Sequence, residues 1–266
     1  PPRSTLFPYT TLFRSNFLAK LENETEKEGL FIIPTSDSDN WAIEQNFEKL
    51  LSMGYDTIPS KTDLALSLDK FLQYTKLSSH NINTPNTLLI NNGPPKNISF
   101  SSPYILKPCF SGEWKTEHSF QVLEGRKAVI INNQSELKYW INKISSISNR
   151  LVLQEIIEQQ NDENYSFCGY AAPKGSLLWG FLTQKILQYP EGFGTAILCR
   201  TIDNRDLFEF GKKVIEALGV EGIFEIEFIR NQKDKQLYVI EINLRHWSQH
   251  RLSTKLGVNI TLLDYH

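Results

Sequence analysis

Two stretches near the C-terminal end decide the fold, Gly222-Ile-Phe-Glu-Ile-Glu-Phe-Ile229 and Leu237-Tyr-Val-Ile-Glu-Ile-Asn-Leu-Arg245. Apolar and polar residues alternate in both, which is typical of half-buried β-strands. A short polar segment separates the two stretches, and this spacing favours pairing as a hairpin. The sequence therefore predicts an antiparallel strand pair in this part of the chain.

The polar positions of this hairpin are mostly carboxylates. Glu225 and Glu227 share one face of the first strand, and Glu241 and Asn243 share one face of the second. Facing carboxylates repel each other unless a cation lies between them. Oxygen ligands of this kind suit Mg²⁺, and Arg245 on the same face would reach a bound phosphate. From the hairpin alone, however, a solvated face of an antiparallel sheet is the favoured interpretation.

The composition describes a folded protein without a strong charge. The chain has 266 residues, of which 40% are hydrophobic and 12% aromatic, and its formal net charge is -2. These values exclude a mainly disordered chain and predict no binding to nucleic acid or to a membrane. Cys109, Cys168 and Cys199 are far apart and lack a metal-ligand spacing, which favours a reducing cytoplasm.

The two ends of the chain indicate a fragment. Residues 1–15 look like the in-frame translation of a common sequencing adapter, and they lack the apolar region of a targeting peptide. We therefore expect the native sequence to start at about Asn16. We also expect a C-terminal truncation, because the chain ends at His266 soon after a helix-like segment.

The remaining patterns predict a mixture of strands and helices. Residues 29–34 form an apolar run typical of a buried parallel strand, and cap-forming residues precede a helix over 41–53, as in the last βα unit of an α/β domain. Further strands are predicted over residues 87–90, 104–108, 128–131, 151–155, 165–172 and 177–187. Helices are predicted over 69–79, 135–144 and 203–218 and from about Trp247, with a sub-domain joint at 145–149 and a glycine loop at 192–194.

Several short motifs follow one another in a characteristic order. They are Leu-Asp-Lys70, Ile-Leu-Lys-Pro108, Val-Leu-Gln-Glu-Ile-Ile157, Lys185, and Glu227 with Glu241-Ile-Asn-Leu-Arg245. This succession resembles the ATP-grasp superfamily, and within it the carboxylate–amine ligases of the D-aspartate ligase-like and carbamoyl-phosphate-synthase-like group. The resemblance extends over residues 29–266, and its most specific part is the final Glu-Ile-Asn-Leu-Arg paired with the upstream glutamate.

The resemblance implies an α+β fold with two α+β sub-domains that enclose ATP between their sheets. Residues 69–150 would form the N-terminal sub-domain and residues 151–266 the C-terminal sub-domain. Residues 16–68 would be the remnant of a Rossmann-like α/β domain that precedes the ATP-grasp fold in this superfamily.

The resemblance also implies a role for particular residues. Lys70 and Lys107 would hold ATP phosphates, and Glu163, or alternatively Asp162, would bind the ribose. The linker that meets the adenine would consist of Gln154, Glu155, Ile156 and Ile157. Mg²⁺, or alternatively Mn²⁺, would be bound by Glu227, Glu241 and Asn243. Lys185 and Arg245 would stabilise the phosphoryl group in transfer.

The implied reaction is ADP-forming ligation of a small carboxylate to an amine, or to an amino-acid-like or peptide-like substrate, through an acyl phosphate. Loops at residues 109–117 and 190–195 would shield that intermediate from water. The alternatives are another phosphoryl transfer on the same fold, a nucleotide-binding protein without turnover, and an α/β interaction domain. One departure concerns Lys185, whose neighbours Gln184, Ile186 and Leu187 provide no second basic residue.

Five further side chains are assigned to packing or to indirect roles. His246 and His250 have the i,i+4 spacing of helical metal ligands, but a third soft ligand is missing from the motif, which favours packing or the substrate side. Trp114 and Trp247 are predicted to pack. Glu225 is predicted to lie behind the metal ligands or to be exposed.

Overall fold

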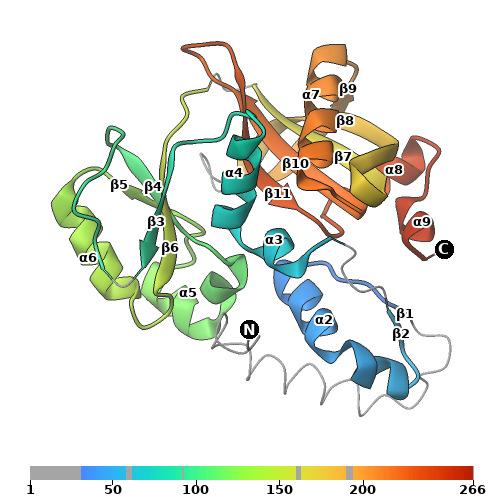
Figure 1. The fold of residues 1–266 in the computed structure, drawn as a ribbon, viewed down its shortest axis with the longest axis horizontal. Coiled ribbons are helices and arrows are strands. Elements are labelled where there is room, and N and C mark those ends of the chain that lie inside the picture. Colours follow the sequence, from blue (N-terminus) through green and yellow to red (C-terminus); the bar gives the residue numbers. More distant parts are fainter. Residues whose placement is uncertain (1–30, 58–61, 92, 160–162, 190–193, 266) are drawn as a thin grey trace.

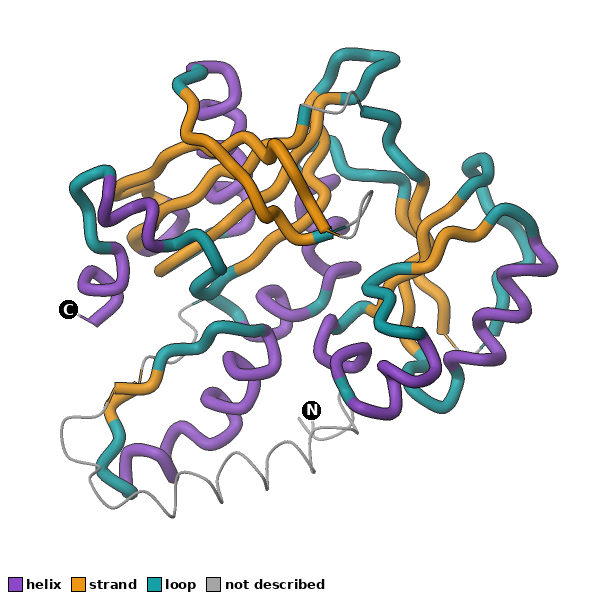
Figure 2. Tube along the Cα trace, turned by 180° about the vertical axis from the view of Figure 1, so that it is seen from behind, coloured by secondary structure: helices purple, strands orange, loops and turns teal. Residues whose placement is uncertain are grey.

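The computed structural model describes residues 31–57, 62–91, 93–159, 163–189 and 194–265. Two antiparallel sheets form the body of this part of the chain, and a small strand–helix–strand unit lies beside them (Figure 1). Figure 2 shows the two groups of strands from behind. Helices and antiparallel sheets are thus combined as the expected α+β class requires. No helix among the described residues is both long and apolar enough to cross a membrane.

The N-terminal unit consists of β1 (Phe31–Ile32), α2 (Asp37–Ser52) and β2 (Asp56–Thr57), and its two short strands pair in parallel. The side chain of Ser36 caps α2 by accepting a hydrogen bond from the backbone N–H of Asp39 at 3.1 Å. This arrangement agrees with the predicted βα unit. The adapter-like residues 1–15 and, within the proposed Rossmann-like segment, residues 16–30 and 58–61 lie outside the described residues, and these include the first two residues of the predicted strand.

The first sheet has the strand order β3-β6-β4-β5. Its strands are β3 (Thr87–Asn91), β4 (Tyr104–Pro108), β5 (Val129–Ile131) and β6 (Arg150–Glu155). The 3-10 helix η1 (Ser111–Lys115) and the helices α5 (Glu117–Leu123) and α6 (Gln134–Ile144) accompany this sheet. Its core includes Leu106, Ile131, Leu137 and Leu153, which are fully buried.

The sub-domain boundary expected at residue 150 is displaced by this topology. β6 was assigned to the second sub-domain, yet it pairs with β3 on one side and with β4 on the other. Its four apolar or amide residues from Leu151 to Gln154 are all buried. The chain therefore leaves the first sheet only after Glu155, through the linker that contains Ile156 and Ile157.

The second sheet has the strand order β11-β10-β7-β8-β9. Its strands are β7 (Asn164–Ala172), β8 (Ser176–Tyr189), β9 (Thr195–Ile202), β10 (Gly222–Arg230) and β11 (Leu237–Asn243), with the 3-10 turn η2 (Pro173–Gly175) between β7 and β8. The predicted hairpin is confirmed, because β10 and β11 pair antiparallel with Glu227 opposite Glu241.

Helices cover both faces of this sheet, which explains why β7 is buried on both sides. Phe167 of β7 belongs to the core beneath α7 (Arg205–Leu218). Its neighbour Cys168 points to the other face, where it joins a cluster with Ile260 of α9 (Ile260–Tyr265). Successive residues of a strand point to opposite faces, so the two clusters require apolar residues at consecutive positions.

The helices that precede the first sheet in sequence pack against the second one. α3 (Leu64–Leu68) and α4 (Lys70–Ser79) contribute Leu66 and Leu77 to the core that lies between α7 and the second sheet. Asp69 caps α4 by accepting a hydrogen bond from the backbone N–H of Leu72 at 3.1 Å. The residue that follows this cap is Lys70, so α4 presents Lys70 directly to β11.

Several elements differ from expectation. β2, α3, α5 and β9 were not predicted, and the final helix from Trp247 is replaced by turns up to the short helix α8 (Arg251–Lys255). β9 is an edge strand exposed at most positions, so its sequence lacks the alternation that marks a half-buried strand. The turn before α8 places His246 outside any helix and makes His250 the residue that precedes one.

Candidate functional site

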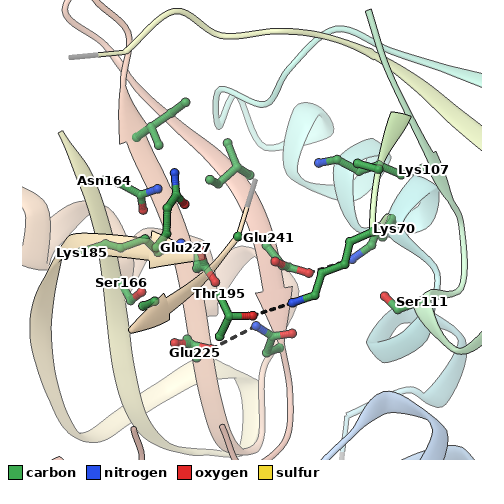
Figure 3. Close-up of a pocket in the computed structure, with 18 of the residues that line it drawn as sticks. Lys70, Lys107, Ser111, Asn164, Ser166, Lys185, Thr195, Glu225, Glu227 and Glu241 are labelled. Carbon is green, nitrogen blue, oxygen red and sulfur yellow. Dashed lines mark hydrogen bonds and ion pairs between the residues drawn. The ribbon is translucent and has the colours of Figure 1, made fainter. Parts of the chain in front are cut away.

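A cavity of about 310 Å³ lies between the two sheets. Its walls come from β4 and the linker after β6 on one side, and from β7, β8, β10 and β11 on the other. Figure 3 shows carboxylates and lysines from both sides directed toward this common space. The site therefore depends on elements that are far apart in sequence and that only the tertiary fold brings together.

Glu227 and Glu241 form the centre of the site. They face each other across the β10–β11 pair, as the alternation predicts. Glu227 forms an ion pair with Lys185, with 2.8 Å between Oε2 and Nζ. Glu241 forms one with Lys70, with 3.2 Å between Oε1 and Nζ. The repulsion expected between facing carboxylates is thus offset by one lysine on each.

The charges around Glu241 decide its protonation state. The Glu241 side chain is 42% exposed within the cavity mouth, and desolvation alone would raise the pKa of its carboxyl group, but Lys70, Lys107 and Arg245 outweigh that effect and lower the pKa to about 2. Burial opposes the charge on Lys70, while Glu241 holds the pKa of Lys70 above its usual value. Both partners are therefore ionised at neutral pH.

Lys107 enters the cavity from β4, and it makes no ion pair with the described residues. Its surroundings, first by desolvation and then by the nearby charge of Lys70, lower the pKa of Lys107 to about 8. Pro108 follows it at the end of the strand and lines the same cavity. An anionic ligand would stabilise the charged form of such a lysine.

Glu225 was expected either to lie behind the metal ligands or to be exposed. The second alternative is wrong, because Glu225 is buried. It is 8% exposed, and one of its oxygens accepts a hydrogen bond from Nδ2 of Asn243 at 3.0 Å. Burial, with the added charge of Glu227, raises the pKa of Glu225 to about 8. Glu225 thus lies beside the predicted ligand Asn243 and orients its amide.

Arg245 is fixed by three protein acceptors. Its Nη2 donates to Oδ1 of Asn243 at 2.9 Å, and its Nη1 donates to the carbonyl of His246 at 3.1 Å. Its Nε donates to Oδ1 of Asp37 at 2.7 Å. Asp37 was not predicted as a site residue, because the sequence marks it only as one of several cap-forming residues at the start of a helix.

The predicted linker borders the cavity along its whole length. Gln154, Glu155, Ile156 and Ile157 all line it. The amide of Gln154 donates to Oγ1 of Thr87 at 2.8 Å, and the carboxylate of Glu155 accepts from the backbone N–H and from Nδ2 of Asn86, both at 2.9 Å. Their side chains are therefore held by the first sheet, and the apolar Ile156 and Ile157 remain for contact with a ligand.

Glu163 is not brought to the cavity. Its carboxylate accepts from Nε of Arg230 at 3.2 Å and from the hydroxyl of Tyr165 at 3.0 Å. Glu163 is absent from the described residues that line the cavity, whereas the next residue, Asn164, is among them. The alternative ribose residue, Asp162, lies outside the described residues.

The packing roles of the tryptophans are consistent with their burial, since Trp114 is 7% exposed and Trp247 is 5% exposed. Both also border the cavity. His246 is 2% exposed, and its ring centroid lies 5.4 Å from that of His250. No group of three or more His, Cys, Asp or Glu side chains in the described part of the chain is arranged to hold a metal ion.

Two segments were expected to act as lids. Residues 109–117 contain η1, and Ser111, Trp114 and Lys115 from this segment line the cavity. Most of the second segment, 190–193, lies outside the described residues, but Thr195 at its end accepts a hydrogen bond from Nζ of Lys127. Lys127 precedes β5 of the first sheet, so this bond joins the two sides of the cavity.

The side chains present fit both Mg²⁺ and a nucleoside triphosphate. Glu227, Glu241 and Asn243 provide the oxygen ligands that Mg²⁺ prefers. Lys70, Lys107 and Lys185 surround them and offer positive charge to phosphates. Ile105, Ile229 and Ile240 line the cavity as well and provide apolar surface for a base.

Comparison with known proteins identifies the family of the chain. The family model described as ATP-grasp domain matches residues 67–248. No curated protein sequence matches the chain.

Solved structures with a similar fold include D-alanine–D-alanine ligase from Bacillus anthracis complexed with ATP, at 15% identity and a TM-score of 0.61, covering 94% of this chain and 80% of that one. L-amino acid ligase from Bacillus licheniformis has 16% identity and a TM-score of 0.58, covering 86% and 52%. N5-carboxyaminoimidazole ribonucleotide synthetase from Thermotoga maritima has 20% identity and a TM-score of 0.50, covering 79% and 51%.

Proposed function

Since this chain belongs to the ATP-grasp domain family, we propose that it is an ATP-dependent, ADP-forming ligase that joins a carboxylate to an amine. The observation that carries the proposal is the pairing of Glu227 with Glu241 across the hairpin, each bound to a lysine, inside a cavity that both sheets line. Such a site presents oxygen ligands and positive charge to the same small volume.

The charge balance of the cavity supports a polyphosphate ligand. Lys107 has no anionic partner among the described residues, and its lowered pKa means that a bound anion would stabilise its charged form. Lys70 and Lys185 are each paired with a carboxylate. When Mg²⁺ is bound by Glu227, Glu241 and Asn243, it neutralises charge on the phosphates and on the group in transfer.

The three lysines and Arg245 would have two different roles, one in binding ATP and one in the transfer of the phosphoryl group. Lys70 and Lys107 enter from α4 and β4 and would hold the phosphates of ATP. Lys185 and Arg245 enter from β8 and from the end of β11 and would stabilise the phosphoryl group as it moves to the carboxylate. The amine would then attack the carbonyl carbon of the acyl phosphate, form the amide bond and release inorganic phosphate and a proton. Trp114 and Trp247, which are buried and line the cavity, would help to keep water away from the acyl phosphate.

The names of the similar structures support a proposal for the substrate class. Two of them are named for ligation of amino acids, D-alanine with D-alanine and L-amino acids. We therefore infer amino-acid-like carboxylate and amine substrates, and we keep the cytoplasm as the expected location. Neither nucleic acid nor a membrane is needed for this reaction.

The decisive experiment measures ADP release from Mg·ATP while the standard L-amino acids and their D-enantiomers are tested in pairs. The ligase predicts release that requires both a carboxylate and an amine. Glu241→Gln should lower turnover by about 100-fold or more at saturating Mg²⁺, with the fold retained, because it removes a ligand charge that the transition state uses.

Glu209→Gln on the exposed part of α7 is the matched control, since it removes a carboxylate that lies outside the cavity. Release of ADP with a carboxylate alone would identify a kinase or an ATPase instead. Stabilisation by Mg·ATP without any turnover would identify a nucleotide-binding regulator. A Glu241→Gln variant with near-normal turnover would reject the metal assignment.

A further inference from the structure

Asp37 lies in the first turn of α2, thirty residues before the segment that matches the family begins at residue 67. It nevertheless lines the cavity and binds the arginine of the Glu-Ile-Asn-Leu-Arg motif. Its Oδ1 accepts from Nε of Arg245 at 2.7 Å, and the two side chains are only 13% and 14% exposed. A short, largely buried ion pair of this kind restricts both side chains more than a surface pair does.

Arg245 has five N–H donors, and the described residues accept three of them. Asp37 takes the Nε donor and Asn243 takes one Nη2 donor, so the plane of the guanidinium group is held at two points. Two donors remain without a protein acceptor in the described part of the chain. A planar group held in this way can offer those donors to a carboxylate or an acyl phosphate in a fixed orientation.

The helix that carries Asp37 is itself anchored. Trp41 and Ala42 of α2 pack in a buried cluster with Leu68 and Phe110, which belong to α3 and to the segment after β4. The amide of the buried Asn40 makes a long contact of 3.5 Å with the carbonyl of Leu244. α2, which Figure 1 shows next to α3, therefore contacts elements on both sides of the cavity.

Asp37 stays charged at neutral pH. Burial alone would raise its pKa, but Arg245, Lys70 and Lys115 outweigh that effect and lower it. The charges of Asp37, Glu241 and Glu225 in turn raise the pKa of Arg245 against the effect of burial. The carboxylate of Asp37 is the one among these that bonds directly to the guanidinium group.

We propose that Asp37 is a positioning residue that orients Arg245 for the substrate carboxylate and its acyl phosphate before they bind. The proposal rests on the proposed function, because it assigns Asp37 a part in that reaction. An arginine that is already ordered loses less conformational freedom when substrate arrives, and its donors are aligned with the reacting group.

The functional test compares Asp37→Asn with Asp39→Asn in the full chain. Asp39 is the matched control because it lies in the same helical turn, and its carboxylate binds Thr35 rather than Arg245. For the amino acid pair that gives ADP release, Asp37→Asn should lower kcat/KM for the carboxylate by about 100-fold, as expected for a misplaced catalytic group. The KM for ATP should stay within about twofold, since Asp37 does not contact the predicted phosphate lysines through a hydrogen bond.

Asp37→Glu should recover part of the loss because it keeps the charge. A purely structural role for Asp37 predicts a lower melting temperature and an equal loss in every kinetic parameter. An Asp37→Asn variant that is folded, binds ATP normally and keeps kcat/KM for the carboxylate would overturn the proposal.

A second measurement does not depend on activity. The Nε–H resonance of Arg245, assigned by its disappearance in Arg245→Lys, should exchange slowly with water in the wild-type protein. It should shift and exchange faster in Asp37→Asn and remain unchanged in Asp39→Asn. An unchanged resonance in Asp37→Asn would reject the positioning role. A wild-type protein without ADP release for any pair would reject the proposed function, and with it the catalytic part of the role, even if the resonance responded.

Discussion

Glu113 shows how a single buried carboxylate can make stability depend on pH. It lies in η1 and is 7% exposed, and its Oε2 has no hydrogen-bond partner among the described residues. Burial raises the pKa of Glu113 to about 7. The protonated form is therefore the one that the folded protein prefers, and ionisation in the folded state costs free energy.

Glu113→Gln should remove this dependence. Because the folded pKa is raised, the stability that Glu113 contributes is complete below pH about 4.5 and is lost as the pH rises through about 7. The free energy of unfolding of the wild type, measured relative to that of Glu113→Gln, should fall by about 3 kcal/mol over this range. Urea unfolding at a series of pH values measures it, with the exposed Glu117→Gln as the control. Parallel pH profiles for wild type and Glu113→Gln would contradict the assignment.

At the scale of elements, Gly211 sets how closely α7 approaches the second sheet. It is buried in the middle of the helix and faces Phe167 of β7. A Cβ atom at this position would lie 2.8 Å from Cβ of Phe167 and closer still to its ring. The ring is fully buried and lies 5.0 Å from that of Phe208 and 5.2 Å from that of Phe224, so little room remains for it to move.

Gly211→Ala should therefore destabilise the protein, although alanine in an exposed helix would stabilise it by about 1 kcal/mol. We expect a loss of about 1–3 kcal/mol in the free energy of unfolding, which is the usual cost of overpacking. Chemical denaturation measures it. In a double-mutant cycle, Phe167→Leu should reduce the cost of Gly211→Ala by making room for the new methyl group. A stabilising Gly211→Ala would show that the helix can move away from the sheet.

At the scale of the whole molecule, the cavity couples two sheets that have separate cores. Lys107 belongs to the first sheet and Lys185 to the second, and both line the cavity. A direct link across it is the hydrogen bond that Lys127, just before β5, donates to Thr195 of β9. A nucleotide that contacts both lysines would add a further link and stabilise the folded state as a unit.

Mg²⁺ with a non-hydrolysable ATP analogue at 100 times its Kd should raise the free energy of unfolding by about 2.7 kcal/mol. Lys107→Ala and Lys185→Ala should each remove about half of this stabilisation or more, because a tenfold weaker Kd costs about 1.4 kcal/mol. Thermal unfolding with and without the analogue measures it, with the exposed Lys255→Ala of α8 as the control. Full stabilisation of either cavity variant would place that lysine outside the nucleotide site.

Much of the architecture could be predicted because its signals are local. The alternation over residues 222–229 and 237–245 depends on neighbouring residues only, and it places Glu227 and Glu241 on one face whatever surrounds them. The same holds for Lys70, which follows a capping aspartate, and for Lys107 at a strand end. β9 escaped prediction because an exposed edge strand has no buried face to impose a pattern.

The tertiary structure alone decided which distant residues meet. The pair of Asp37 with Arg245 joins positions 208 residues apart, and no local pattern distinguishes Asp37 from Asp39. Arg230 and Tyr165 hold Glu163 away from the cavity, although its place in the chain suggested a ribose contact. The sequence by itself thus determined most of the strands, the hairpin and the positions of Lys70 and Lys107 at a helix start and a strand end, because periodicity and capping act between neighbours. Which sheet β6 joins, where α4 packs and which carboxylate orients Arg245 depend on long-range contacts, and only the folded chain specifies them.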